Sequence, residues 1–247
     1  MSEPDRTLAR RLASEALASG QPLAWFEPLY LASEAGGPAV PWADMAPNPE
    51  LRAWSRSGRS PHDGGGRALV VGCGLGDDAE LLDSLGYDVV AFDVAPTAVR
   101  LCRRRFPSSG VEYVVADLLE PPPTWHRAFD LVFEANTLQS LPAGEVRDRA
   151  IAGLSSLVAT GGTLLVVARG REQSDPLGEL PWPLTRAEVL ACAGSQLILE
   201  RVEDRYDDEV PPVRRFVATF RHRAASYPAR SKGWVPMHGS GDGHRPG

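Results

Sequence analysis

A short apolar run that ends in three closely spaced glycines constrains the fold of this chain more than any other feature. Residues 68–71 are Ala, Leu, Val and Val, and Gly72, Gly74 and Gly76 follow at alternate positions before a helix-like segment at residues 78–85. Alternating glycines let a strand-to-helix turn press its backbone against a ligand with no Cβ in the way. The helix that follows would offer free backbone N–H groups to the same ligand. The pattern therefore predicts a ligand-binding turn between a buried strand and a helix.

Strand-like and helix-like segments alternate along the rest of the chain. Short apolar runs predict strands, and segments with helical spacing lie between most of them. This alternation predicts an α/β fold with a Rossmann-like, doubly wound and mostly parallel sheet of seven strands, covered by helices on both faces. Ligands of such sheets bind beyond the carboxyl ends of the strands. The predicted strands cover residues 67–71, 88–92, 112–115, 129–134, 163–168, 196–201 and 213–220, and the predicted helices cover residues 78–85, 97–105, 144–157 and 186–192.

The residues before the first predicted strand form a helical and aromatic segment of their own. Residues 6–19 carry leucines at helical spacing, and Trp25, Phe26, Tyr30 and Trp42 follow them. These aromatic side chains would either close over the ligand as a lid or pack into the core. We therefore expect an N-terminal lid segment at residues 1–57 and a ligand-binding domain at residues 66–223. A disordered tail is expected at residues 224–247, where Pro, Gly, Ser, His and Arg dominate.

Composition and charge limit the partners and the compartment. The 247 residues carry a net charge of −6, which argues against nucleic acid as a partner because such binding depends on clustered positive charge. The basic run of Arg103, Arg104 and Arg105 fits a solvated helix C-terminus. The three cysteines are widely spaced, which predicts a reducing, cytoplasmic compartment with neither disulfides nor a metal site. Neither a signal peptide nor a membrane span is evident in the sequence.

Acidic residues stand where three of the predicted strands end. Asp93 follows the second strand, Asp117 follows the third and Glu134 ends the fourth. A carboxylate after the second strand can accept hydrogen bonds from both hydroxyls of a ribose, and one after the third can accept from an adenine amino group. Each residue also has a structural alternative: Asp93 could cap the next helix, Asp117 could be an ordinary loop residue and Glu134 could pair with a buried partner. Their order on consecutive strand–helix units favours one shared ligand site.

The glycine spacing and the strand ends together resemble the class I S-adenosylmethionine (SAM) dependent methyltransferases over residues 68–168. The dinucleotide fingerprint requires glycine at position 77, where this chain has Asp77, and the G-x-G-x-G spacing found here is that of the methyltransferases. More narrowly, residues 23–221 resemble the thiopurine S-methyltransferase family, which includes plant thiol and halide methyltransferases. The motifs that carry this narrower resemblance lie at residues 25–30, 41–51, 67–98 and 137–142. Val70 replaces the acidic residue that most class I members have two positions before the first glycine.

The resemblance implies SAM as the cofactor and S-adenosylhomocysteine as its product. The cofactor contacts would be Trp25, Gly72, Cys73, Gly74, Gly76, Asp77, Asp93, Val94, Asp117, Leu118, Glu134 and Ala135. The substrate pocket would be formed by Phe26, Tyr30, Trp42, Asn136 and Trp182. Human-type members have arginine at the position of Ala135, so that contact is absent here and the identity of the methyl acceptor stays open.

The function that the resemblance implies is S-methylation of a thiol or of a thiopurine-like small molecule. Methyl transfer from a sulfonium is an in-line displacement, to which an enzyme contributes proximity and alignment. A thiol with a pKa of about 8.5 is partly ionised at neutral pH and needs no strong base. No pair of a histidine and a carboxylate stands near the motifs. For an oxygen or nitrogen nucleophile, Glu134 or Asp44 would act as the base.

Three alternatives stay open. The first is an O- or N-methyltransferase of a natural-product intermediate, and the second is a SAM-binding regulatory protein of the same fold. The third is a nicotinamide-dependent oxidoreductase, which Asp77 disfavours. The partner would be a small molecule rather than nucleic acid or a membrane. The resemblance implies a monomer, with a dimer as the alternative.

Overall fold

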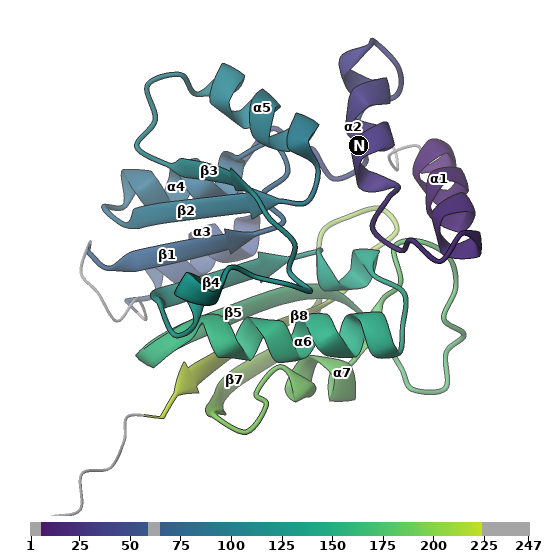
Figure 1. Ribbon diagram of the computed structural model, residues 1–247. Coiled ribbons are helices and arrows are strands. Elements are labelled where there is room, and N and C mark those ends of the chain that lie inside the picture. The colour runs from purple at the N-terminus through teal and green to yellow at the C-terminus, as the bar shows by residue number, and fades with distance from the viewer. Residues whose placement is uncertain (1–5, 59–64, 224–247) are drawn as a thin grey trace, which may run out of the picture.

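The computed structural model describes residues 6–58 and 65–223 and has a twisted sheet at its centre (Figure 1). The first five strands in the sheet are parallel, and β8 runs antiparallel to both of its neighbours. The predicted α/β fold with a mostly parallel sheet of seven strands is therefore confirmed. A two-residue strand, β6 (Leu184–Thr185), pairs with β5 in addition. The order is β3 (Glu112–Val115), β2 (Asp88–Asp93), β1 (Arg67–Val71), β4 (Phe129–Ala135), β5 (Val158–Arg171), β8 (Arg214–His222) and β7 (Leu197–Tyr206).

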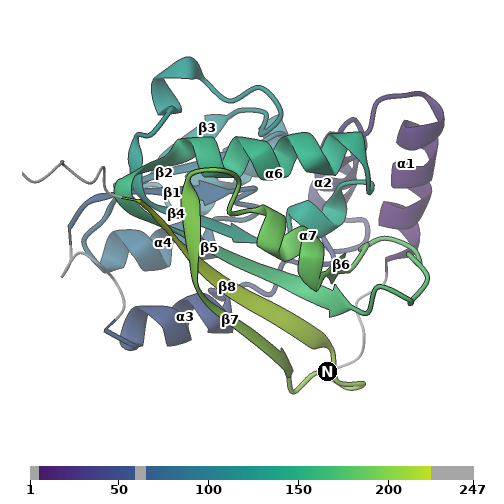
Figure 2. The same ribbon diagram turned by 90° about the horizontal axis from the view of Figure 1, so that it is seen from below.

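Alternate side chains of the central strands enter two separate cores. Leu69 and Val71 of β1 pack with α6 (Glu145–Leu157) and α7 (Arg186–Ala191). Ala68 and Val70 pack on the other face with α3 (Pro49–Arg56) and α4 (Asp77–Ser84), and α5 (Pro96–Arg105) contributes to both cores. Figure 2 shows α6 and α3 on opposite sides of the sheet. Burial on both faces explains why the strands appear in the sequence as nearly continuous apolar runs.

Two N-terminal helices, α1 (Thr7–Ala18) and α2 (Phe26–Glu34), lie together beyond the ends of β1 and β2 (Figure 1). Glu27 joins α2 to α5, because its carboxylate accepts hydrogen bonds from the backbone N–H of Thr97 at 2.9 Å and from its hydroxyl at 2.7 Å. Arg10 of α1 donates to the backbone oxygen of Leu180 at 3.0 Å. The third helix of the N-terminal segment, α3, instead covers a face of the sheet.

Two strands are longer than the sequence indicated. β7 extends beyond residue 201 because it pairs with β8 as far as Tyr206. β5 extends beyond the predicted residues 163–168 at both ends, where Val158 pairs with β4 and residues 170–171 pair with β6. Two short 3₁₀ helices, η1 (Pro123–Trp125) and η2 (Leu138–Ser140), precede and follow β4. The expected tail at residues 224–247 lies outside the described residues, as do residues 59–64 between the expected lid segment and the expected ligand-binding domain.

Two features bear on possible partners. The basic run at the end of α5 is engaged within the chain: Arg104 pairs with Glu34 at 2.8 Å, Arg105 pairs with Asp77 at 2.9 Å and Arg103 donates to the backbone oxygen of Tyr113. These three cations are therefore already matched by acceptors of the fold. In the part of the chain that the structure describes, no helix has both the length and the apolarity to cross a membrane.

Candidate active site

A cavity of about 610 Å³, counted to its open mouth, lies at the carboxyl ends of the central strands. The strand order reverses between β1 and β4, which is where open α/β sheets bind their ligands. The wall is formed by Leu23, Phe26, Tyr30, Trp42, Gly72, Phe92, Asp93, Val94, Ala116, Asp117, Leu118, Leu119, Ala135, Asn136, Thr137, Ser140 and Leu141.

Asp93 ends β2 at the cavity wall and holds two loops together. Its Oδ2 accepts a hydrogen bond from the backbone N–H of Gly74 at 3.1 Å, and its Oδ1 accepts from that of Ala95 at 2.9 Å. Ala95 is the N-cap residue of α5, so the interpretation of Asp93 as that cap is wrong. Burial raises the pKa of Asp93 to about 6, although the backbone donors oppose the rise. Each carboxylate oxygen keeps a lone pair for a further donor in the cavity.

Of the three glycines in the loop after β1, only Gly72 lines the cavity. Its φ is +61°, and a Cβ at this position would lie 2.3 Å from Oγ1 of Thr137. The hydroxyl of Thr137 in turn donates to the backbone oxygen of Val71 at 3.1 Å. Glycine is thus required because the turn after β4 packs directly on the loop after β1.

The rest of the glycine loop supports the cavity from outside its wall. Gly76 has a φ of +92°, and a Cβ there would lie 2.6 Å from the hydroxyl of Tyr113. Asp77 accepts two hydrogen bonds from Arg105, at 2.9 and 3.0 Å. Neither the first turn of α4 nor Cys73 and Gly74 line the cavity. The expectation that the N-terminus of this helix faces the ligand is therefore not met in the described cavity.

The turn after β4 contains a buried carboxylate. Glu134 is fully buried, and its Oε1 accepts hydrogen bonds from the backbone N–H groups of Thr137 at 2.7 Å and Leu138 at 2.9 Å. Burial raises its pKa to about 7. Glu134 shapes the turn and does not line the cavity. This position does not suit a base that acts on a molecule in the cavity.

Asn136 lies at the tip of the same turn and lines the cavity. Its φ of +66° is unusual for a residue with a side chain, although asparagine tolerates it better than most residues. Its backbone N–H donates to the oxygen of Val167 at 3.1 Å, and its backbone oxygen accepts from the hydroxyl of Ser140 at 2.9 Å. These contacts place its carboxamide firmly at the wall.

Aromatic residues of the N-terminal segment form the wall that faces the strand ends. Phe26, Tyr30 and Trp42 line the cavity, and the Nε1 of Trp42 donates to the hydroxyl of Tyr30 at 3.0 Å. Burial raises the pKa of Tyr30 well above its ordinary value, so this side chain is a neutral phenol. Trp25 stacks on Phe26 with ring centroids 4.0 Å apart, but it belongs to the core and not to the wall. The segment therefore supplies both a wall and core packing.

Two other expected residues lie away from the cavity wall. Asp44 is exposed, although partial desolvation of its carboxyl and the nearby charge of Glu209 raise its pKa. Trp182 is held by its backbone, whose N–H donates to the oxygen of Gln139 at 2.7 Å. The structure thus places six of the twelve expected cofactor residues and four of the five expected substrate residues in the wall. These ten are Gly72, Asp93, Val94, Asp117, Leu118, Ala135, Phe26, Tyr30, Trp42 and Asn136.

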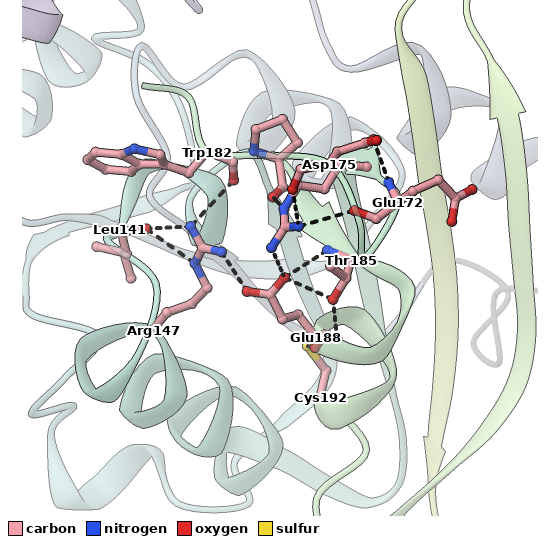
Figure 3. A network of polar contacts seen from close by, with 10 residues as sticks. Leu141, Arg147, Glu172, Asp175, Trp182, Thr185, Glu188 and Cys192 are labelled. Atoms are coloured by element: carbon pink, nitrogen blue, oxygen red, sulfur yellow. Dashed lines mark hydrogen bonds and ion pairs between the residues drawn. The ribbon is translucent and has the colours of Figure 1, made fainter. Parts of the chain in front are cut away.

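Sequence reasoning missed a buried arginine that ties the cavity rim to the neighbouring segments (Figure 3). Arg147 of α6 is only 1% exposed and donates two hydrogen bonds to the backbone oxygen of Leu141, which lines the cavity, at 2.7 and 3.2 Å. It also contacts the backbone oxygen of Trp182 at 3.4 Å and forms an ion pair of 2.7 Å with Glu188. Thr185 and Glu188 complete a capping box at the start of α7. A single arginine on a helix gives no sequence signal of such a role.

The chemistry of the wall is limited to two carboxylates and neutral groups. Asp93 and Asp117 are its only ionisable acids apart from the phenol of Tyr30, and it contains no histidine, lysine, arginine or cysteine among the described residues. The described residues also contain no cluster of histidine, cysteine and acidic side chains that could hold a metal ion. The carboxylates can accept hydrogen bonds from hydroxyl or amino groups, and the aromatic wall suits a flat apolar group.

Comparison with known proteins identifies the class of the chain. Residues 69–166 match the methyltransferase domain family. A probable thiol methyltransferase 2 of Arabidopsis thaliana is 31% identical over 167 residues, which cover 67% of this chain and 68% of that protein. A 2-heptyl-1-hydroxyquinolin-4(1H)-one methyltransferase of Mycobacteroides abscessus is 24% identical over 207 residues, covering 81% of this chain and 86% of that protein.

Solved structures share the fold. An N-methyltransferase, NodS of Bradyrhizobium japonicum in complex with S-adenosylhomocysteine, aligns with a TM-score of 0.61 at 20% identity and covers 79% of this chain and 98% of its own. A structure from work on the conversion of a disulfide bond into a thioacetal group during echinomycin biosynthesis aligns with a TM-score of 0.67 at 20% identity, covering 83% and 93%. The chain belongs to the class I SAM-dependent methyltransferases. It is an enzyme that uses SAM as its cofactor, and the interpretation as a nicotinamide-dependent oxidoreductase is wrong.

Proposed function

We propose that this SAM-dependent small-molecule methyltransferase methylates the sulfur of a thiol or thiopurine-like acceptor. The observation that carries the proposal is the absence of a base from the side of the cavity formed by Leu23, Phe26, Tyr30, Trp42, Asn136, Ser140 and Leu141, all of them described residues. We call this side the acceptor wall. Tyr30 is its only ionisable group, and burial keeps it protonated. An acceptor that binds there must therefore be nucleophilic without deprotonation by a protein base.

A thiol meets this requirement better than an alcohol or an amide. A thiol with a pKa of about 8.5 is ionised to a few per cent at neutral pH and is intrinsically very nucleophilic. Proximity and orientation alone can contribute about 7–11 kcal/mol to such a displacement. The acceptor wall can supply both proximity and orientation, because Phe26 and Tyr30 are buried and their rings pack against that of Trp42. The likeness to a probable thiol methyltransferase supports the same acceptor class.

The remaining wall fits the cofactor. Asp93 keeps lone pairs for the two hydroxyls of a ribose, and Asp117 with Leu118 would hold an adenine ring by its amino group and its face. Gly72 lets the backbone approach the bound molecule, and Val94 and Ala135 complete this side. When bound, SAM supplies a methyl group on an electrophilic sulfonium. Six expected contacts lie outside the wall and would support it from behind: Trp25, Cys73, Gly74, Gly76, Asp77 and Glu134.

A second candidate is methylation of an oxygen or nitrogen atom on a heterocycle. It is favoured by the relative from Mycobacteroides abscessus, whose name specifies a hydroxyquinolinone and of which this chain covers 86%. An acidic N-hydroxyl group would, like a thiol, need little help from a base. The flat aromatic acceptor wall accommodates either kind of molecule.

The test combines cofactor binding with an acceptor screen. Calorimetry should show that S-adenosylhomocysteine binds the wild type and that Asp93→Ala loses most of that affinity. Asp88→Ala, at the exposed opposite end of β2, is the matched control and should bind normally. Methyl transfer is then measured with an aromatic thiol, the corresponding phenol and the corresponding aniline. A rate that follows the ionisation of the thiol and exceeds the other two supports S-methylation, whereas transfer to the phenol or aniline alone would refute it.

A further inference from the structure

A carboxylate of the N-terminal segment caps the helix that follows Asp93. This helix, α5, has Ala95 at its N-cap position, and the side chain of Ala95 makes no capping hydrogen bond. Glu27 of α2 takes that role, because its carboxylate accepts hydrogen bonds from the backbone N–H of Thr97 at 2.9 Å and from its hydroxyl at 2.7 Å. The capping side chain usually belongs to the N-cap residue itself. Here it comes from a different helix, 70 residues earlier in the chain.

The cavity wall continues on both sides of this contact. On α2, Phe26 stands next to Glu27 and Tyr30 follows one turn later, and both belong to the acceptor wall. On the other side, Asp93 lies just before α5 and belongs to the proposed cofactor side. Burial raises the pKa of Asp93, and the nearby charge of Glu27 adds to the rise. The contact therefore lies at the junction between the two sides of the cavity.

The contact has a fixed geometry. Thr97 is only 2% exposed, and the backbone N–H that it donates belongs to a helix and cannot turn away. A hydrogen bond from N–H to a carboxylate is charge-assisted and stronger than one between neutral groups. A second carboxylate of α2, that of Glu34, pairs with Arg100 at 2.6 Å and with Arg104 at 2.8 Å, but both arginine side chains are more than half exposed. Exposed ion pairs contribute little, so Glu27 provides the stronger link between α2 and α5.

We propose that Glu27 is a positioning residue for methyl transfer, which holds the acceptor wall in register with the cofactor side. By fixing α2 on the first turn of α5, it fixes Phe26 and Tyr30 relative to Asp93. An in-line displacement requires the nucleophile and the methyl group to be aligned, and a misplacement of about 1 Å can cost about 100-fold in rate. Glu27 itself does not line the cavity, so it acts through α2. This inference rests on the proposed function, which assigns the two sides of the cavity.

Variants of the two α2 carboxylates test the proposal. Glu27→Ala removes the cap, and Glu27→Gln keeps an oxygen that can accept from the backbone N–H of Thr97. Glu34→Ala is the matched control, because Glu34 also joins α2 to α5 but stands at the last position of α2. Each variant is assayed with whichever of the aromatic thiol, the phenol and the aniline the wild type methylates fastest. Rates are expressed per S-adenosylhomocysteine-binding site, counted by calorimetry, so that unfolded protein does not count as slow enzyme.

The expected result is a loss of catalysis without a loss of cofactor binding. Glu27→Ala should lower kcat/KM for the acceptor by about 10–100-fold, because α2 shifts while Asp93 stays bonded to the backbone of Gly74 and Ala95. Glu27→Gln should recover part of this loss. Glu34→Ala should stay within about twofold of wild type, and affinity for S-adenosylhomocysteine should stay within about threefold in every variant.

Other outcomes would overturn the proposal. Equal effects of Glu27→Ala and Glu34→Ala, whether large or small, would show that the place of Glu27 beside the cavity is immaterial. A fall in affinity for S-adenosylhomocysteine as large as the fall in kcat/KM would make Glu27 a support of the cofactor site alone. Both results leave S-methylation intact.

Failure of the proposed function is a separate result. A wild type that methylates only the phenol or the aniline refutes S-methylation, and the same variants then decide the role of Glu27 with that acceptor. A wild type that binds S-adenosylhomocysteine but methylates none of the three refutes the proposed function, and this inference with it.

Discussion

Replacement of Gly72 by alanine tests the packing of the two turns that meet at the cavity. The added Cβ would sit 2.3 Å from Oγ1 of Thr137, 3.1 Å from its Cγ2 and 3.3 Å from its Cβ. The left-handed φ of +61° costs about 1–2 kcal/mol for a residue with a Cβ. Thr137 must also rotate away and give up its hydrogen bond to Val71, which is worth about 0.5–1.5 kcal/mol. The sum predicts a destabilisation of about 1.5–3.5 kcal/mol, with further loss if the turn itself moves.

The assay is urea denaturation of Gly72→Ala beside Gly20→Ala. Gly20 has a φ of +71°, but no atom lies within 4 Å of the position that an added methyl group would take, so this control reports the backbone cost alone. Gly72→Ala should lower the free energy of unfolding by about 1 kcal/mol or more beyond the effect of Gly20→Ala. This excess should shrink when Thr137→Ala is added. Affinity for S-adenosylhomocysteine should fall in Gly72→Ala only. Equal destabilisation by the two alanines would refute the argument that the turn after β4 dictates glycine at position 72.

Two further predictions concern buried charges near the cavity. Burial raises the pKa of Glu134 from 4.5 to about 7, so its stabilising contribution is present below pH 4.5 and is lost as the pH rises through 7. Between pH 4.5 and pH 8 the unfolding free energy of Glu134→Gln should therefore rise relative to wild type by up to about 3 kcal/mol, and a difference that is flat with pH would contradict this origin. Arg147→Met should cost about 3 kcal/mol in urea denaturation and raise KM for the acceptor, because Leu141 and Glu188 lose their partner. Arg149→Met, two residues along α6 and exposed, should stay within about 0.5 kcal/mol of wild type, and equal shifts in the two variants would count against the network.

The sheet could be predicted from the sequence because its central strands are buried on both faces. In β1 and β2 nearly every residue is apolar and buried, so the strands appear as short apolar runs whatever the tertiary context. β7 follows a different rule. Ile198, Leu199 and Tyr206 are exposed on this edge strand, and charged residues lie between them. Its length is set by its pairing with β8. The local sequence pattern therefore predicted only the first half of this strand.

The residues at the strand ends were predictable for a similar reason. Asp93 ends β2 and Asp117 lies two residues after the end of β3, and parallel strands bring their carboxyl ends to one edge of the sheet. The reason for glycine at position 72 could not be predicted, because a Cβ there is excluded by Thr137, which lies far along the chain in the turn after β4. The same holds for Arg147, whose partners Leu141, Trp182 and Glu188 come from three separate segments.

The two sides of the cavity are therefore built from different parts of the fold. The proposed cofactor side is built from backbone and carboxylates at strand ends, with Gly72 after β1 and Asp93 at the end of β2. The acceptor wall is built from an N-terminal helix and from the turn after β4, which the sheet does not constrain. Asn136 belongs to this second group: it lines the cavity from the tip of that turn, where its backbone has a φ of +66°. The choice of acceptor should therefore be sought in this turn and in the N-terminal segment rather than in the glycine loop.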